Sequence, residues 1–482
     1  MNTIIEKTSY ASSRFLIINL MNRGLGFFFI IVISRNIPQE SFGIYVLAVS
    51  VAGIFQIVGA FGLPVAIQKF LSGEKKEYRY LGSVLLLGAV FAFISTLGLY
   101  ILSRVIAIDF YHNPKLLEPL KLISFSVFFT ILYTINKAIL QSKLKMRSIA
   151  IYDLVRQILK IIVVFLILNI SKNINLVIIS LIISISLSYL LSLNSIIRMV
   201  GIKNISIRND EIRAIFNYSL PLLFVGISYF LAYQTDRLMI GSMLDTKAVG
   251  IYAVASNIAM FSSMFRGPFV NAFMPLLTNI YQKQKFHDMK ILFLFLIKWP
   301  SVFLGALVIL YFGWGKNLIE IFGKDYVLDD TYLILLVLGL GTYFSNLFGP
   351  IGSFLQLTNG NKLEFINSII FVISNIFFNY FFITKFGLIG AAFATVIAEI
   401  IFNFIRIVEI YHREKFIILS FNSIMFSIII ILIGIVIFHF DSLIWQKILS
   451  VLFVLFFLWT NFKTMSKEEK MFLLNFKLKI WR

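Results

Sequence analysis

Residues 80–103 read YLGSVLLLGAVFAFISTLGLYILS and contain no Asp, Glu, Lys or Arg. A helix of about 20 apolar residues spans the hydrocarbon core of a bilayer, so this stretch predicts a transmembrane helix. The whole chain of 482 residues has the same character, with 59% hydrophobic and 14% charged residues and a mean hydropathy of +0.91. Soluble domains are roughly 45–50% apolar and 25% charged. The composition therefore indicates a membrane protein and excludes a soluble enzyme or nucleic-acid binder.

Similar apolar stretches recur along the whole sequence, separated by charged or Gly, Pro and Asn residues. We place them at 12–34, 43–66, 80–103, 120–141, 148–170, 174–197, 215–240, 248–274, 291–312, 331–356, 364–384, 387–411, 416–440 and 443–462. The fold class predicted is an all-α polytopic membrane protein with about 14 transmembrane helices. Alternate loops on one side carry more than twice as many Lys and Arg residues as those on the other. This asymmetry predicts that both termini lie in the cytoplasm.

A short motif indicates an internal repeat. Residues 43–45 and 250–252 both read GIY, and each copy opens a span after a short loop. Six spans separate the copies, so both enter the membrane from the same side, as expected of parallel repeats related by an axis along the membrane normal. We therefore predict an N-lobe at 1–200, a C-lobe at 201–412, and two further helices with a basic tail at 413–482.

Metal and thiol chemistry find no support in the sequence. There is no Cys, which excludes disulfides, a thiolate nucleophile and Cys-based metal ligation. The four His residues are scattered singly, which disfavours a His metal cluster. We expect neither a metal site nor a cofactor.

Charged residues inside the predicted spans are the strongest functional signal. A charge at mid-span costs roughly 2.5–3.5 kcal/mol, so these side chains are expected to face a water-filled cavity or one another. The basic ones are Arg14, Arg23, Lys137, Arg156, Lys160, Arg237, Arg266 and Lys298, and the acidic ones are Asp153, Asp236 and Glu399. Arg14 lies near a span end, where it can snorkel to the interface. The other seven bases are candidates for binding an anion such as a diphosphate, which Arg clasps bidentately and Lys holds as a point charge.

The span at 148–170 is the most informative of these. Asp153, Arg156 and Lys160 are spaced i, i+3 and i+7, which places them on one helix face. An Asp153–Arg156 ion pair is one interpretation, and a cationic stripe is the one we favour. On the preceding span, Tyr133 and Lys137 share a face and would add an aromatic wall and another cation.

The intramembrane acids Asp153, Asp236 and Glu399 are candidates for ion coupling. Asp236 adjoins Arg237, so the two can simply neutralise each other. Glu399 is predicted near mid-depth, where desolvation favours the protonated acid and suits it to carry H⁺ or hold Na⁺. A salt bridge to a base on a neighbouring helix is the alternative for Glu399.

Three longer motifs carry a family resemblance. Residues 236–241 read DRLMIG and lead into VGIYAVA at 249–255, and residues 386–392 read FGLIGAA. With the arrangement of six, six and two spans, the chain resembles the Wzx-type polysaccharide flippases of the multidrug/oligosaccharidyl-lipid/polysaccharide (MOP) exporter superfamily. The resemblance implies transport of an undecaprenyl-diphosphate-linked oligosaccharide, such as an O-antigen repeat unit, to the outer leaflet of the bacterial cytoplasmic (inner) membrane. It also implies alternating access between the lobes, with membrane lipids and polysaccharide assembly proteins as partners.

Two other functions remain open at this stage. A lipid II flippase would carry the same diphosphate and is the nearest alternative. A polymerase or glycosyltransferase would need a sizeable outer loop for its catalytic residues, yet the loops at 104–119 and 313–330 are short and lack an acid/base constellation. We therefore expect a transporter rather than an enzyme.

Overall fold

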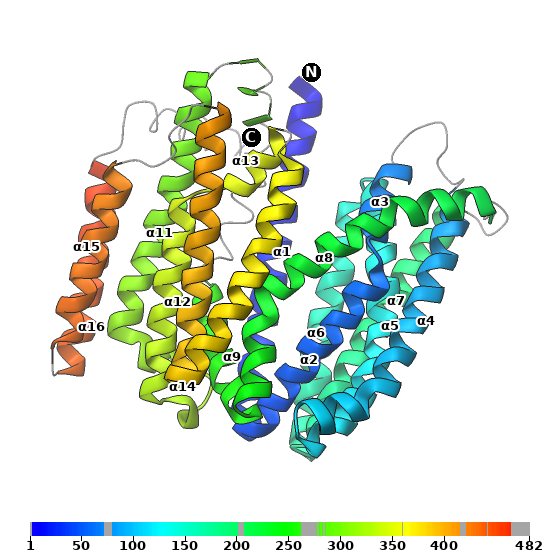
Figure 1. Ribbon diagram of the computed structural model, residues 1–482, viewed down its shortest axis with the longest axis horizontal. Coiled ribbons are helices and arrows are strands. Elements are labelled where there is room, and N and C mark those ends of the chain that lie inside the picture. Colours follow the sequence, from blue (N-terminus) through cyan, green and yellow to red (C-terminus); the bar gives the residue numbers. More distant parts are fainter. Residues whose placement is uncertain are drawn as a thin grey trace. The chain divides into compact units, whose positions relative to one another are not determined.

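The computed structural model describes residues 2–71, 80–200, 207–261, 277–278, 280–281, 283–284, 286–358, 360–414, 421–440 and 442–463, and the regular elements of this part of the chain are helices (Figure 1). Contacts divide the chain into two compact units. The first unit is residues 17–253, and the second unit is residues 254–482 together with 1–16.

Nine helices begin in or contribute to the first unit. They are α1 (Asn2–Asn36), α2 (Gln39–Ala60), α3 (Leu63–Leu71), α4 (Leu81–Arg104), α5 (Leu117–Ser142), α6 (Met146–Ile170), α7 (Ile174–Val200), α8 (Asn209–Met243) and α9 (Thr246–Phe261). A π-helical turn at Val105–Phe110 and a 3₁₀ turn at Pro114–Leu116 join α4 to α5. The predicted span at 43–66 consists of two helices, because Phe61 and Gly62 take positive φ angles between α2 and α3.

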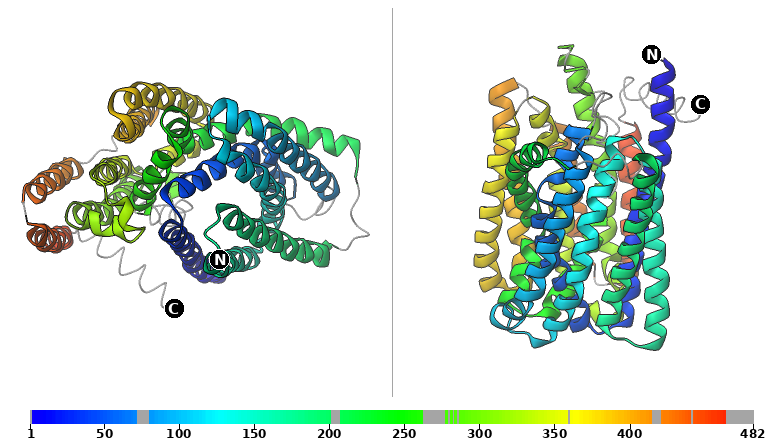
Figure 2. Two further views of the ribbon diagram at one scale, coloured as in Figure 1. Left: turned by 90° about the horizontal axis from the view of Figure 1, so that it is seen from below. Right: turned by 90° about the vertical axis from the view of Figure 1, so that its right-hand side faces the viewer.

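Helix α5 is the centre of the first unit. It packs against α2, α3, α4, α6 and α7 and buries a continuous apolar side that includes Leu132, Ile135 and Ile139. Helix α8 crosses the N-terminal helices obliquely and contacts α2, α3 and α4 (Figures 1 and 2). The polar face of α5 is thereby left to meet α6, where the candidate site lies.

Serine residues at every fourth position explain how closely α7 packs. Ser180, Ser184, Ser188 and Ser192 repeat along one face of α7 and are all buried. Small residues let membrane helices approach each other without a hydrophobic driving force. Ser192 also accepts a 2.9 Å hydrogen bond from the Asn136 amide of α5, which ties the two helices together.

The two copies of the GIY motif meet at a helix crossing. A Cβ atom placed on Gly43 of α2 would lie 1.6 Å from the carbonyl oxygen of Thr246, and one placed on Gly250 of α9 would lie 2.7 Å from that of Gln39. Thr246 precedes Gly250 by four residues, as Gln39 precedes Gly43, so the contact is reciprocal. Only glycine permits backbones to come this close. The recurrence of the motif therefore has a direct structural cause.

The second unit is built around α11. Its helices are α11 (Phe286–Glu320), α12 (Asp329–Leu347), α13 (Ile351–Leu357), α14 (Asn361–Glu414), α15 (Phe421–Phe438) and α16 (Leu443–Lys463). Helix α11 packs against α12, α15 and α16, and α14 packs against α12 and α13. Phe293 of α11 and Phe354 of α13 are buried with ring centroids 5.4 Å apart, at the centre of one apolar core.

Helix α14 contains two of the predicted spans. Its backbone stays helical except at Gly387, whose φ is 58° and ψ is −136°. L-residues with a side chain avoid that conformation, so glycine turns the chain between the two halves of α14. The sequence boundary predicted between 384 and 387 is thus confirmed.

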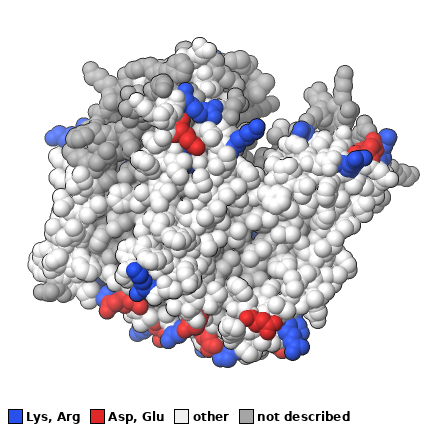
Figure 3. Space-filling view, in the orientation of Figure 1, with Lys and Arg blue, Asp and Glu red and all other residues white. Residues whose placement is uncertain are grey.

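The helical architecture confirms the predicted fold class. Nine segments in the described residues are long and apolar enough to cross a membrane, and Ile428–Phe438 is a shorter apolar helix. The described part of each of the 14 predicted spans is mainly helical, but the span at 331–356 consists of two helices, α12 and α13, with residues 348–350 between them. The span at 248–274 is described only as far as Phe261, and the span at 416–440 only from Phe421. Large apolar side chains such as Ile101, Phe165 and Phe377 are more than half exposed. On the face drawn in Figure 3, charged residues gather toward the helix ends and leave uncharged surface between them. The protein is a multi-pass membrane protein.

The compact units do not follow the predicted lobe boundaries. Because α8 packs on α2, α3 and α4, the contact-based division falls between Ala253 and Val254, inside α9. The lobes at 1–200 and 201–412 are defined by repeat symmetry, and they stay a prediction.

Candidate functional site

Asp153 of α6 is the centre of a charged cluster in the first unit. Its carboxylate accepts a 2.8 Å hydrogen bond from Lys137 Nζ and a 2.9 Å hydrogen bond from the Tyr133 hydroxyl, both on α5. Arg156 Nη2 lies 3.3 Å from Asp153 Oδ1, one turn along α6. The Arg156 guanidinium also lies 5.4 Å from the centroid of the Tyr133 ring. The spacing on α6 and the shared face of α5 thus bring together four residues that the sequence had singled out.

The cations of this cluster remain available to a ligand, whereas its acid does not. The Asp153 side chain is 9% exposed, but those of Lys137 and Arg156 are 41% and 30% exposed. A buried carboxylate therefore orients two partly exposed cations. The Asp153–Arg156 ion pair that the sequence left open is present, and Lys137 joins it, so positive charge remains in excess.

Lys160 extends the charged face of α6 toward α1. Its ammonium lies 3.9 Å from the centroid of the buried Phe29 ring, a cation–π contact. Gln157, between the two charged positions on α6, lies against Gly26 of α1. Arg23 is exposed on α1. Whether Arg23 shares a cavity with Arg156 and Lys160 stays a prediction.

Asp236 and Arg237 lie on α8, and each forms a hydrogen bond with another polar side chain. Asp236 accepts a 2.7 Å hydrogen bond from the hydroxyl of Tyr252 on α9. Arg237 donates to the Gln234 side chain over 3.5 Å, and Gln234 accepts a further hydrogen bond from Ser50 of α2. These contacts join α2, α8 and α9 near the glycine crossing.

In the second unit, Arg406 forms a buried ion pair that links the two halves of α14. Arg406 donates two hydrogen bonds to Glu364, one of them over 2.9 Å, and their side chains are 12% and 4% exposed. Asn403 accepts a weaker hydrogen bond from the same guanidinium and donates to Ser345 of α12. Glu399 lies about two turns from Arg406 on the same helix and is partly buried. The predicted roles of Glu399, Asp236 and Asp153 in ion coupling stay predictions.

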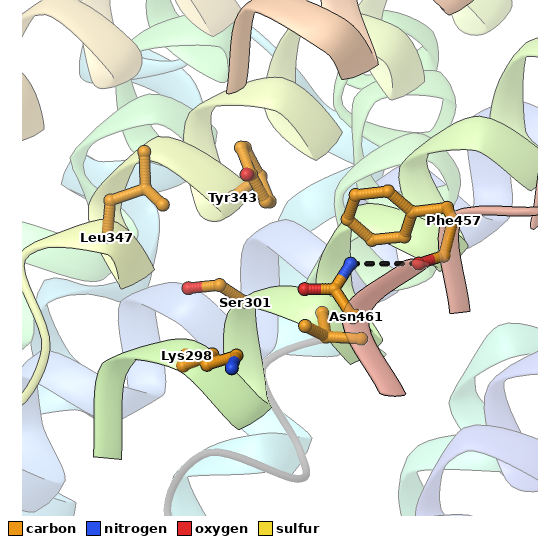
Figure 4. Close-up of a pocket in the computed structure, with 7 residues that line it drawn as sticks. Lys298, Ser301, Tyr343, Leu347, Phe457 and Asn461 are labelled. Carbon is orange, nitrogen blue, oxygen red and sulfur yellow. Dashed lines mark hydrogen bonds between the residues drawn. The ribbon is translucent and has the colours of Figure 1, made fainter. Parts of the chain in front are cut away.

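Lys298 lines a small pocket between α11, α12 and α16 (Figure 4). The pocket encloses about 20 Å³, room for one water molecule. Ser301, Tyr343 and Asn461 contribute its polar atoms. This pocket lies in the second unit and does not include the cluster around Asp153. Of the remaining candidates, Arg266 lies outside the described residues, and for Arg14 only the helical backbone is described.

Sequence reasoning missed several partners of these charges. Glu364 lies at the predicted edge of a span, where the sequence does not distinguish a buried acid from an ordinary loop residue. Phe29 lies within a span, where the sequence does not distinguish a buried aromatic residue from one that faces lipid. Gln157 and Gln234 are neutral and carry no charge signal. Gly387 was one available signal. A reversal of the chain at this glycine brings the end of the second half of α14, with Arg406, near the start of the first half, where Glu364 lies.

Comparison with known proteins places this fold. A solved structure of the lipid II flippase MurJ in an inward closed conformation matches with a TM-score of 0.73 and 20% identity, over 92% of this chain and 97% of that one. A MATE family multidrug transporter of the MOP superfamily shares the fold at 14% identity and a TM-score of 0.67, over 83% of this chain and 98% of that one. The MatE family also matches residues 221–381.

Curated relatives agree at the level of sequence. An uncharacterized membrane protein of Methanocaldococcus jannaschii is 26% identical over 83% of this chain and 97% of its own length. A probable low-salt glycan biosynthesis flippase of Haloferax volcanii is 22% identical over 80% of each chain. The fold is the one that these flippase and multidrug transporter structures share. Residues 12–281 match the polysaccharide biosynthesis protein family, and the chain belongs to that family.

Proposed function

We propose that this protein moves an undecaprenyl-diphosphate-linked oligosaccharide, such as an O-antigen repeat unit, from the inner to the outer leaflet of the cytoplasmic membrane. The observation that carries the proposal is the cluster of Lys137 and Arg156 around the buried Asp153, with Lys160 further along the same face of α6. Partly exposed cations on membrane helices suit a diphosphate, because hydrogen bonds between ionised partners are strong when water is scarce. A cationic drug would meet repulsion there.

In this mechanism, each residue of the cluster has its own task. Asp153 holds Lys137 and Arg156 in position and lowers the cost of carrying two cations in the membrane. The Lys137 ammonium and the Arg156 guanidinium bind the phosphate oxygens. Alternating access of the two lobes then exposes the occupied site to the opposite side, and both termini lie in the cytoplasm. Polysaccharide assembly proteins supply and consume the lipid-linked glycan.

Lipid II is the second candidate substrate. The similarity to the MurJ fold favours it, and its carrier presents the same diphosphate. Two curated relatives favour a polysaccharide repeat unit, because their names place them in glycan biosynthesis. One is the glycan biosynthesis flippase, and the other is a capsular polysaccharide biosynthesis protein of Staphylococcus aureus. Complementation of strains lacking either flippase separates the two substrates.

Flipping of a fluorescent undecaprenyl-diphosphate oligosaccharide in proteoliposomes tests the proposal. Each of Arg156→Ala and Lys137→Ala removes a charge-assisted hydrogen bond of about 1.5–3 kcal/mol, so the rate should fall at least about tenfold. Arg104→Ala changes an exposed Arg at the end of α4 and serves as the matched control, with an unchanged rate. Arg23→Ala is expected to impair flipping as well. Wild-type rates in both cluster variants, or a wild-type protein that moves no diphosphate lipid, would refute the proposed function.

A further inference from the structure

Two side-chain contacts join α1 to α6 at equal steps along both helices. Gly26 lies against the Gln157 amide, since a Cβ at Gly26 would be 3.6 Å from Gln157 Nε2. Three residues further along both helices, Phe29 lies under the Lys160 ammonium. Equal steps on the two helices mean that they run in the same direction. One turn earlier, therefore, Asn22 on α1 comes to the level of Asp153 on α6.

Asn22 is buried without satisfying its side chain. The residue is 8% exposed, and neither the oxygen nor the nitrogen of its amide has a hydrogen-bond partner in the described part of the chain. The side-chain oxygen of Gln157 is also buried and lacks a partner among the described residues. Buried polar atoms in native proteins are nearly always hydrogen-bonded. The Asn22 amide and the Gln157 oxygen therefore leave room for a ligand that supplies the missing donors and acceptor.

The surroundings of Asn22 offer a path for such a ligand. Arg23, the next residue on α1, is exposed, so the side of the helix next to Asn22 is open. The amide itself is covered in this structure, so a ligand would reach it only in a state in which α1 and α6 lie further apart at this level. Asp153, with its two cations, is at the same height.

We infer that Asn22 and Gln157 bind the first sugar of the lipid-linked glycan, at the hydroxyl or acetamido group next to its anomeric carbon. This inference rests on the proposed function, in which Lys137 and Arg156 bind the diphosphate. The group bonded directly to a diphosphate is the anomeric carbon of that sugar, so the substituent on the adjacent carbon lies nearest to the phosphate site. An amide has two donors and one acceptor and no charge, which complements a hydroxyl or acetamido group. These amides are thus specificity-determining residues.

Equilibrium binding to the full-length protein in nanodiscs tests this assignment. The probes are undecaprenyl diphosphate and the same lipid carrying N-acetylglucosamine or galactose, whichever binds wild type more tightly. Asn22→Leu removes the amide but keeps its volume, and it should raise the Kd for the sugar-bearing lipid about tenfold while the Kd for the bare diphosphate is unchanged. Asn22→Gln retains an amide and should recover part of the affinity. Asn36→Leu, at an exposed position on the same helix, should change neither Kd.

Each contrary result has a distinct meaning. If Asn22→Leu weakens both lipids equally or neither, or if wild type binds bare and sugar-bearing lipids alike, the amides do not read the sugar and this inference falls alone. If wild type binds no diphosphate lipid at all, the proposed function falls with it. Should Asn22→Leu not fold, Gln157→Leu decides the question in the same comparison.

Discussion

Asp153 shows how a single residue controls the charge of a membrane site. Its carboxylate is buried, yet it serves two cations and a tyrosine hydroxyl at once. Removing it would leave Lys137 and Arg156 facing each other without a counter-charge. The cluster is therefore held together by its one acid, and the cations retain enough exposure to bind an anion.

We expect Asp153→Asn to lower the free energy of unfolding by about 1–3 kcal/mol, because it weakens two hydrogen bonds and an ion pair and leaves two cations unneutralised. Thermal unfolding in detergent measures the loss. Asp329→Asn is the control, since the ion pair of Asp329 with Lys316 is exposed and should contribute little to the free energy of unfolding. Equal losses in the two variants would show that the cluster around Asp153 contributes no more than a surface pair.

Arg406 and Glu364 provide a second residue-scale prediction. Their side chains are nearly covered, so Arg406→Met should cost about 3–5 kcal/mol by leaving a buried carboxylate without its partner. The double variant Arg406→Met with Glu364→Met removes both charges and should recover most of that stability. The melting temperatures of the single and double variants give the coupling directly. A double variant less stable than either single variant would contradict this account.

At the scale of helices, the reciprocal contact of Gly43 and Gly250 fixes how closely α2 and α9 cross. An added methyl group at Gly43 would collide with backbone, which cannot rotate away as a side chain can. Gly43→Ala should therefore destabilise the fold by about 3 kcal/mol or more. Gly98→Ala on α4 is the matched control, because its Cβ would make ordinary contact with Phe55 and alanine favours helix. Similar melting temperatures for both variants would mean that α2 and α9 can move apart at this crossing without loss of stability.

The sequence predicted the positions of the helices well, but it did not predict which helices pack against each other. Each span is marked by its own run of about 20 apolar residues, a local signal that needs no tertiary information. Even so, the break at Phe61 and Gly62 within the span at 43–66 was missed, because a short apolar helix such as α3 continues the same run. The contacts of Lys137 with Asp153 and of Arg406 with Glu364 depend on which helices are neighbours, and apolar periodicity does not encode that. The site was predicted as a set of charges and acquired its geometry only from packing.

At the scale of the whole molecule, the driving force follows from the charge of the cargo. Exporting a diphosphate moves negative charge away from a negative interior, and each charge crossing the full potential gains roughly 2.3 kcal/mol per 100 mV. An inside-negative potential should therefore accelerate outward flipping in proteoliposomes. A flipping rate that does not change with the membrane potential would contradict this, and would mean that positive charge crosses together with the diphosphate and neutralises it.

Return of the empty transporter is the step at which we propose that H⁺ or Na⁺ acts, with Glu399 as the carrier group and Asp236 or Asp153 as further acids. Glu399→Gln fixes the neutral form and should slow multiple-turnover flipping by about tenfold or more while leaving substrate binding unchanged. Flipping rates across pH and Na⁺ gradients provide the test. If Glu399→Gln matched wild type under every gradient, the coupling role would be withdrawn and potential-driven export retained.

The glycine crossing also constrains how this chain can change over generations. Gly43 and Gly250 stand at equivalent places in the two copies of one motif, and each is held small by backbone belonging to the other copy. The backbone of one copy therefore leaves no room for a larger residue at the glycine of the other copy, even though more than 200 residues separate the two positions. At this contact, both positions must therefore remain glycine together.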